Sequence, residues 1–270
     1  MKFTPIIKFV SIIALFFASW ISLSQINWVE ILRIKQAGQT TEEHLGELIW
    51  HVLDKTERVV KNKKVTAPID SIINRLCEKN QIDRSQIKVH IVDKKEVNAF
   101  ALPNKYLVLH TGLILSADTE AELAGVLAHE IAHMEHDHVM KKLIKEIGLS
   151  VLTSITLGEN AGVLIKEILA LLSSSAYDRA LEEEADRTAV RYLETAEIDP
   201  KPFANFFYKL AKNEHEIQSY TSWISTHPSS KKRAEYVLDL IDYNKTIFSP
   251  ILTEEEWTSL KEYIREYQAY

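Results

Sequence analysis

The sequence predicts an α+β fold that is mainly helical, with a small antiparallel sheet of about three strands. Three short segments, 87–92, 98–102 and 106–110, have the pattern of strands, and longer segments with helical spacing precede and follow them. Short strands among helices are typical of a sheet packed against helices. The 270 residues, 46% of them hydrophobic, can bury a substantial core in one large or two small domains.

The composition excludes some partners and bonds. The formal net charge of −6 gives no basic field for nucleic acid, and no stripe of Lys and Arg offsets it. The single cysteine, Cys77, excludes an internal disulfide. Seven glycines and seven prolines are too few for long flexible linkers. We therefore expect no nucleic-acid partner, and the sequence leaves the oligomeric state open.

The N-terminal segment differs from the rest of the chain. Lys2 and Lys8 precede an uncharged apolar run over 9–23, a pattern typical of a secretory signal peptide. Counted over 6–23, the run is also long enough for a membrane anchor, and a buried N-terminal helix is a third alternative. We expect 1–26 to be a signal peptide or an anchor. Lysines without arginines favour bacterial export over mitochondrial import, which predicts a periplasmic or cell-envelope protein.

Helices and turns around the strands are predicted from spacing and from their ends. Apolar residues recur at helical spacing in 42–60, and a second helix is expected to open at Pro68, a favoured first-turn residue. A turn at 103–104 joins the last two strands. A capping box that begins at Thr119 predicts a long helix through His138 or beyond.

The second half of the chain is predicted to be helical. Residues 147–172 are strongly apolar, but Gly158-Glu159-Asn160 and Lys166-Glu167 interrupt them. A packed helical hairpin therefore fits better than a membrane span, which stays the alternative. The remaining helices are expected over 178–193, from Pro202, over 231–242 and over 254–268, with a loop at 227–228.

A His-Glu-x-x-His pattern lies on the predicted long helix, at His129, Glu130 and His133. Residues four apart on a helix share a face, so both imidazoles can reach one zinc ion. Glu130 lies close enough to take a proton from a metal-activated water as a general base. The alternative is an exposed, charged helix face. A metzincin needs Gly at 136 and His at 139, but this chain has His136 and Val139, which excludes that class.

A third metal ligand is sought on the predicted helix over 178–193. A helical wheel centred on Glu182 places Asp186 on the same, apolar face, where unpaired carboxylates are costly. We expect Glu182 to be the ligand and Asp186 to accept a hydrogen bond from His129. An ion pair with a buried lysine or arginine is the alternative. We expect His136 to lie near the ligands or in solvent without binding the metal.

Four sequence blocks together resemble one family of zinc peptidases. They are Asn98-Ala-Phe-Ala-Leu-Pro103, Glu122-Leu-Ala-Gly-Val-Leu-Ala-His-Glu-Ile-Ala-His133, Arg179-x-x-Glu-x-x-Ala-Asp186 and Ser225-Thr-His-Pro-x-x-x-x-Arg233. The chain resembles metallopeptidase family forty-eight, which includes the HtpX-like, Oma-like and CAAX-prenyl-protease-like enzymes. The resemblance covers roughly 42–242 and implies a single zincin-like metallopeptidase domain over 27–270. With at most one membrane segment, the chain is most similar to the soluble or singly anchored bacterial branch.

The resemblance implies a role for each matching residue. It implies one zinc ion on His129, His133 and Glu182, with Glu130 as the general base and Asp186 as the carboxylate behind a ligand. It also implies that an edge strand pairs with an extended substrate backbone, and this strand falls on Asn98, Ala99, Phe100 and Ala101.

His227 matches the histidine of the family's His-Pro loop. It is expected to stabilise the oxyanion formed when water attacks the peptide carbonyl. Two alternatives are a fourth metal ligand that holds the enzyme inactive and a structural turn. Arg233 is expected to fix this region through an ion pair whose partner the sequence does not identify.

The leading functional prediction is an exported zinc endopeptidase that acts on unfolded or misassembled envelope proteins, with membrane association through 6–23 as an option. The first alternative is a client-binding assembly factor or chaperone whose latent protease site is capped by His227. The second is a zinc protein without catalysis, against which the intact Glu130 argues.

Overall fold

The computed structural model describes residues 12–13, 15–16, 34–157, 161–213, 221–227, 231–244 and 247–268. The chain divides into a unit over Met1–Thr41 and a unit over Glu42–Tyr270. The predicted signal peptide or anchor lies outside the described residues, except for 12–13 and 15–16. Across the part of the chain that the structure describes, no helix is both long and apolar enough to cross a membrane.

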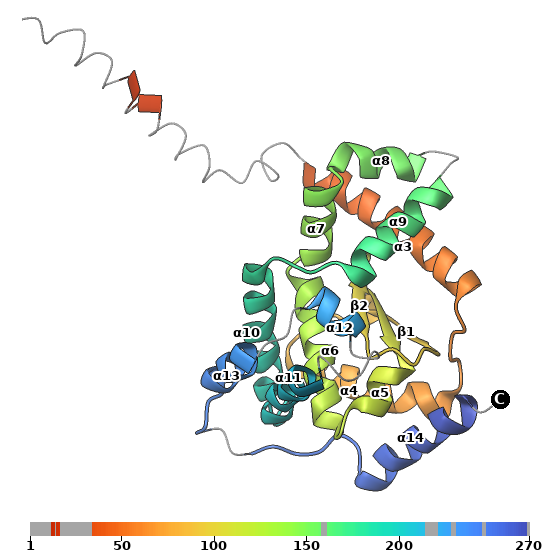
Figure 1. The fold of residues 1–270 in the computed structure, drawn as a ribbon, viewed down its shortest axis with the longest axis vertical. Helices are drawn as coiled ribbons and strands as arrows, with labels where there is room; N and C mark the ends of the chain where they lie inside the picture. The colour runs from red at the N-terminus through yellow and green to blue at the C-terminus, as the bar shows by residue number, and fades with distance from the viewer. Residues whose placement is uncertain are drawn as a thin grey trace, which may run out of the picture. The chain divides into compact units, whose positions relative to one another are not determined.

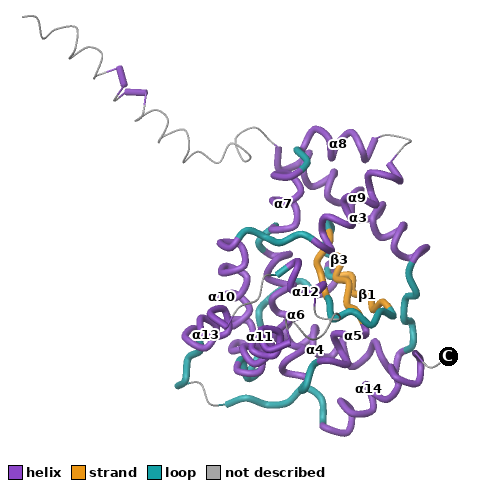
Figure 2. The backbone as a smooth tube through the Cα atoms, in the orientation of Figure 1, coloured by secondary structure: helices purple, strands orange, loops and turns teal. Residues whose placement is uncertain are grey.

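The second unit is built mainly of helices around a small sheet (Figures 1 and 2). The elements in chain order are α3 (Ile34–Thr56), which starts in the first unit, α4 (Lys63–Lys79), η1 (Arg84–Gln86), β1 (Lys88–Val92), β2 (Ala99–Leu102), β3 (Tyr106–His110), α5 (Thr111–Ser116), α6 (Glu120–Glu135), α7 (His138–Glu146), α8 (Leu149–Leu157), α9 (Ala161–Ser174), α10 (Arg179–Thr195), α11 (Lys201–Asn213), α12 (Thr221–Thr226), α13 (Lys231–Leu240) and α14 (Glu254–Gln268). The predicted α+β class is confirmed.

Helix α4 begins earlier than predicted. Its first residue is Lys63, because the Asn62 side chain accepts a hydrogen bond from the backbone N–H of Lys64 and caps the helix there. Pro68 therefore lies inside the helix rather than at its start.

The sheet is mixed, so the expectation of an antiparallel sheet is confirmed for β2 and β3 and is wrong for β1. The strand order is β1-β3-β2, with β2 antiparallel to β3 and β1 parallel to β3. The tight turn between β2 and β3 places Asn104 and Lys105 at positive φ values of 61° and 53° and forces antiparallel pairing. Because β3 inserts between β1 and β2, β1 pairs with a strand that is not its neighbour in sequence.

Helix α6 is the central element of this unit. The predicted cap is confirmed, since the Thr119 side chain accepts a hydrogen bond from the Glu122 backbone N–H. The helix packs against α4, α10, α11 and β2. A Cβ at Gly125 would lie only 2.5 Å from the Cβ of Phe203 on α11, so glycine permits this close approach.

Helix α6 ends before the predicted point. His136 caps its C-terminus, and Asp137 adopts a left-handed conformation with φ of 55° and ψ of 27°. A new helix, α7, starts at His138, so the prediction of one helix through His138 is wrong. The break changes the direction in which His138 points.

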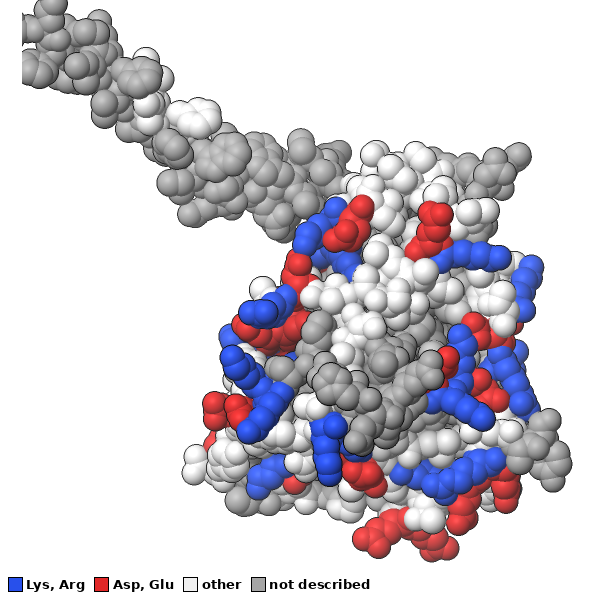
Figure 3. Space-filling view, viewed as in Figure 1, with Lys and Arg blue, Asp and Glu red and all other residues white. Residues whose placement is uncertain are grey.

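The apolar segment over 147–172 forms two helices, α8 and α9, as the hairpin prediction requires. Ile165, Ile168 and Leu172 of α9 are buried, while Val163 is 70% exposed. Charged side chains of both signs are interspersed over the face in Figure 3, and the surface over α8 is largely uncharged.

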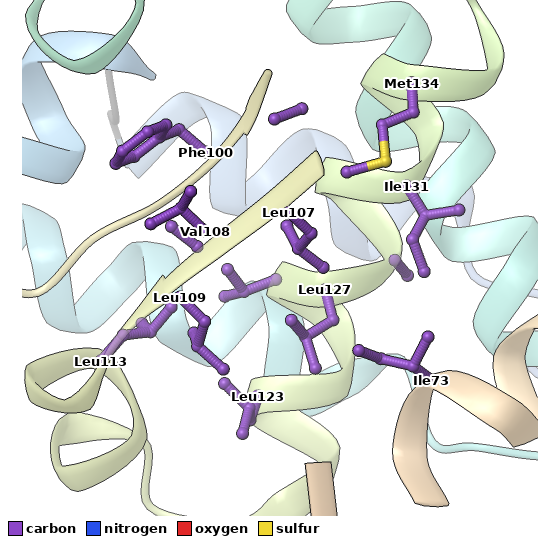
Figure 4. Packing of buried hydrophobic residues seen from close by; sticks show 14 of the residues in the cluster. Ile73, Phe100, Leu107, Val108, Leu109, Leu113, Leu123, Leu127, Ile131 and Met134 are labelled. Atoms are coloured by element: carbon purple, nitrogen blue, oxygen red, sulfur yellow. The ribbon is translucent and has the colours of Figure 1, made fainter. Parts of the chain in front are cut away.

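The core lies between the sheet and α6. Leu107 and Leu109 of β3 point toward α6, where Leu127 packs on them, whereas Val108 points to the opposite side of the strand near Phe100 (Figure 4). This alternation buries both faces of β3, because every residue of β2 and β3 is buried. The sheet and α6 therefore share one buried core.

Candidate metal centre

Helix α6 places His129, Glu130 and His133 in the interior, and all three are 0% exposed. The two imidazoles lie one turn apart on the same face, with 3.0 Å between their Nε2 atoms. At this distance either one Nε2–H donates to the other nitrogen, or both nitrogens are unprotonated and can bind one shared metal ion.

Glu182 reaches the same point from α10. Its Oε1 lies 3.3 Å from Nε2 of His133, and its Oε2 lies 3.7 Å from Nε2 of His129. The carboxylate is buried near the N-terminus of its helix. Helices α6 and α10, far apart in sequence, thus bring three candidate ligands together.

His227 lies directly after α12 and completes the cluster. Its Nδ1 lies 3.2 Å from Nε2 of His129 and 2.9 Å from Oε1 of Glu182. Its Nε2 lies 3.2 Å from Oε1 of Glu130. The residue therefore contacts both the candidate ligands and the candidate base, and it is fully buried. Pro228 lies outside the described residues.

The donor set fits a zinc ion. One donor atom from each of His129, His133, Glu182 and His227 lies within 4.8 Å of the others. Two ligand atoms on a tetrahedral zinc ion are separated by about 3.3 Å, because each bond is about 2.0–2.1 Å long. The five contacts between these residues given above, 2.9 to 3.7 Å, scatter around that value, and no pair of the four donor atoms is more than 4.8 Å apart. Three imidazole nitrogens and one carboxylate oxygen are donors that zinc accepts.

Asp186 and Arg233 lie behind these residues. Asp186 Oδ1 is 3.0 Å from Nδ1 of His129. The Arg233 guanidinium donates to both oxygens of Asp186, at 2.6 and 2.8 Å, and its Nη1 lies 2.6 Å from Oε2 of Glu182. Both buried carboxylates therefore have an arginine partner, so their burial does not by itself require a metal. The convergence of three imidazoles on Glu182 is the observation that indicates one.

Burial and neighbouring charges act in opposite directions on the pKa values of the two buried carboxylates, Glu182 and Asp186. Burial acts to raise the pKa of Glu182 and of Asp186, but the charge of Arg233, with hydrogen bonds from the neighbouring groups, outweighs it. The pKa of Glu182 is held well below its usual range, and that of Asp186 is also lowered. Both side chains are therefore available as anionic ligands or acceptors at neutral pH.

Glu130 differs from its neighbours. Burial raises its pKa to about 8, and the negative charge of Glu182 adds to the effect. The backbone N–H of Ala101 on β2 donates to its Oε2 at 3.0 Å. Burial therefore disfavours the ionised form of Glu130 in this arrangement, and the hydrogen bond from Ala101 holds the side chain against the strand.

The strand predicted to bind substrate lies at the edge of the sheet, but it is covered. Asn98, Ala99, Phe100 and Ala101 are all buried. Helices α6 and α9 pack against β2, and α12 packs against α9. A substrate backbone can therefore reach this edge only if the cover moves.

A residue that the sequence prediction missed contacts a candidate ligand. His138 Nδ1 lies 2.9 Å from Nδ1 of His133, and its Nε2 lies 3.1 Å from Oε2 of Glu184. His136, which was expected near the ligands or in solvent, is half-buried and lies 2.9 Å from the Thr188 hydroxyl. The position of His138 depends on the helix break at Asp137, which the sequence prediction did not include.

The chain is similar to known peptidases. The family model "Peptidase family M48" matches residues 63–241. The mitochondrial metalloendopeptidase OMA1 of Bos taurus is 29% identical over 215 residues, which cover 71% of this chain and 40% of that protein. The beta-barrel assembly-enhancing protease of Yersinia pestis is 27% identical over 210 residues, 71% of this chain and 42% of that protein. The chain thus spans about two fifths of the length of these relatives.

Proposed function

The chain belongs to peptidase family M48, and from this premise we propose that it is a zinc endopeptidase with His129, His133 and Glu182 as metal ligands. The observation that carries the proposal is the convergence of their donor atoms in a buried site beside Glu130. Bound zinc would polarise the attacking water and the peptide carbonyl. The protein's own groups would move the protons.

Glu130 is the proposed general base. It is adjacent to His129 on α6, and its Oε1 lies 3.2 Å from Nε2 of His227, a member of the cluster. When the cover opens and water enters, the pKa of Glu130 falls toward its ordinary range and the carboxylate ionises. It then accepts a proton from water and passes it to the leaving amine.

The proposed substrates are unfolded or misassembled proteins of the cell envelope. Pairing of an extended backbone with β2 would supply main-chain hydrogen bonds and tolerate varied side chains. The similarity to a protein named beta-barrel assembly-enhancing protease supports the envelope as the location. The proposed route there is the export or anchoring signal in residues 1–26.

A second candidate function rests on His227. Its Nδ1 lies where a fourth ligand would lie, and its Nε2 contacts Glu130. This geometry favours a cap on the site over an oxyanion donor in the closed arrangement. The corresponding function is an assembly factor or chaperone that binds clients and cleaves them rarely. Stabilisation of the oxyanion stays the proposed role of His227 when the site is open.

Cleavage of casein by the full-length protein tests the endopeptidase proposal. Glu130→Gln should retain one zinc per chain and lose activity by about 100-fold or more, because only the proton acceptor is removed. If the wild-type protein binds zinc but wild type and variant are equally inert on several unfolded substrates, the endopeptidase proposal fails and the assembly-factor function is favoured.

A further inference from the structure

His138 is placed beside a candidate ligand by the break between α6 and α7. In an uninterrupted helix, the fifth residue after His133 would point about 140° away from it. The left-handed conformation of Asp137 turns the chain, and the first residue of α7 returns to the ring of His133. His138 is 0% exposed, so the contact lies in the interior.

The contacts define the proton positions along this chain of rings. Nε2 of His133 faces His129 and Glu182, at 3.0 and 3.3 Å, and it must be unprotonated to bind a metal. Nδ1 of His133 therefore carries the proton and donates to Nδ1 of His138 at 2.9 Å. His138 must then carry its own proton on Nε2, which donates to Glu184 at 3.1 Å.

From this geometry we infer that His138 and Glu184 are positioning residues that orient His133 for metal binding. The inference rests on the proposed zinc site. A histidine ligand is held in one ring orientation and one tautomer when its second nitrogen donates to a fixed acceptor. His138 is that acceptor, and the Glu184 carboxylate fixes the tautomer of His138 in turn.

His129 and His133, the two candidate ligands on α6, are therefore held by different kinds of chemical group. Behind His129 is the buried carboxylate of Asp186, which Arg233 holds with two hydrogen bonds. Behind His133 is a neutral imidazole, and its own support is Glu184, whose side chain is 49% exposed. The His133 side thus forms a path of hydrogen bonds from the site to the surface of the protein, whereas the His129 side ends in the interior.

His136 provides a matched comparison. It lies two residues before His138, its ring stacks on that of His138 with centroids 5.4 Å apart, and its Nδ1 lies 3.7 Å from Glu184. Its Nε2, however, bonds Thr188 and not a candidate ligand. If this cluster only stabilised the fold, replacing either histidine would disturb it. If the cluster orients His133, only replacement of His138 removes the contact that does so.

Zinc affinity of the full-length protein, measured by competition with a chromophoric chelator, tests the inference. His138→Leu should weaken zinc binding by about tenfold or more, and His136→Leu should leave it unchanged. His138→Asn should restore most of the affinity, because its side-chain oxygen lies at the position of Nδ1 and can accept from His133. Equal affinity of His138→Leu and wild type, or equal losses in both leucine variants, would overturn the inference.

A second measurement needs no variant and applies even if His138→Leu does not fold. Long-range ¹H–¹⁵N spectra of the zinc-loaded wild type should show His138 with an unprotonated Nδ1 and a protonated Nε2. Protonation of His138 at Nδ1 would overturn the inference although zinc is bound. A wild-type protein that binds no zinc would instead overturn the proposed metal site, and this inference with it.

Discussion

At the scale of single residues, Glu182 has two kinds of partner. Its oxygens face the imidazoles of His133 and His227, and they also form an ion pair with Arg233. A buried carboxylate with an arginine partner can be stable without a metal. If Glu182 is the third ligand, its replacement must lower metal binding and not only the stability of the fold.

Replacement of Glu182 by alanine is therefore expected to lower the zinc content sharply from one ion per chain. The change removes one anionic donor and leaves two neutral imidazoles with His227. Zinc content after dialysis, measured by atomic absorption, is the readout, and Glu183→Ala on the exposed side of the same helix is the control. Zinc content that is unchanged in Glu182→Ala would show that another residue is the third ligand.

The sequence identified the residues of the cluster better than it identified their partners. The apolar face of α10 could be read from the spacing of Glu182 and Asp186, because helical periodicity is local. Arg233 as the partner of both carboxylates could not, since it lies on α13 and an ion pair across helices depends on tertiary packing. The contact between His133 and His138 was missed because the sequence prediction did not include the helix break at Asp137.

At the scale of elements, the break after α6 shows where local patterns are insufficient. The segment around Asp137 has no Gly or Pro to end a helix, and aspartate adopts the left-handed conformation more readily than most residues but does not require it. Burial of His138 and of Val139 against the core decides the new direction. Periodicity alone therefore predicted one helix where the structure has two.

Helix α9 packs on both β2 and α12, and we therefore expect it to control access to the site. Its buried residues, Ile165, Ile168 and Leu172, hold it against the rest of the unit. The candidate ligands and the edge strand are buried, so we expect a movement of the surrounding elements to precede any exchange of metal or peptide.

Ile168→Ala should therefore speed the removal of zinc by excess chelator. Loss of a buried isoleucine side chain weakens the closed arrangement by about 2 kcal/mol, which corresponds to roughly tenfold to thirtyfold in rate. The rate is followed by the absorbance of the chelator complex. Val163→Ala, at an exposed position of the same helix, should leave it unchanged. Equal rates for the two variants would mean that α9 does not control access.

At the scale of the whole molecule, the fold class and most helices were predictable, but the pairing of β1 was not. The turn between β2 and β3 is local and was read from the sequence. The parallel partnership of β1 and β3 joins segments separated by a whole strand, and no local pattern distinguishes it from antiparallel pairing with β2. The prediction for residues 1–26 is still open, since most of them lie outside the described part of the chain.

The sheet also contains a histidine, His110, whose titration makes the stability of the fold depend on pH. His110 lies at the end of β3, is buried, and has its ring edge-on to Phe100 at 5.9 Å. Burial lowers its pKa to about 4, and the charge of Lys94 adds to the effect. In the unfolded chain the pKa is near 6.5. Between these values the unfolded chain binds a proton that the folded protein does not, so the stability is complete above about pH 6.5 and falls below it.

We expect His110 to reduce the free energy of unfolding by about 1 kcal/mol between pH 7.5 and 5.5. In His110→Gln this part of the loss should vanish, because glutamine does not titrate, while the control His51→Gln, at an exposed position, should behave as the wild type. Urea unfolding of the zinc-free protein at the two pH values measures the difference without a contribution from metal release. If His110→Gln loses as much stability on acidification as the wild type, His110 already takes up its proton in the folded protein, and the acid sensitivity of the fold arises at other groups.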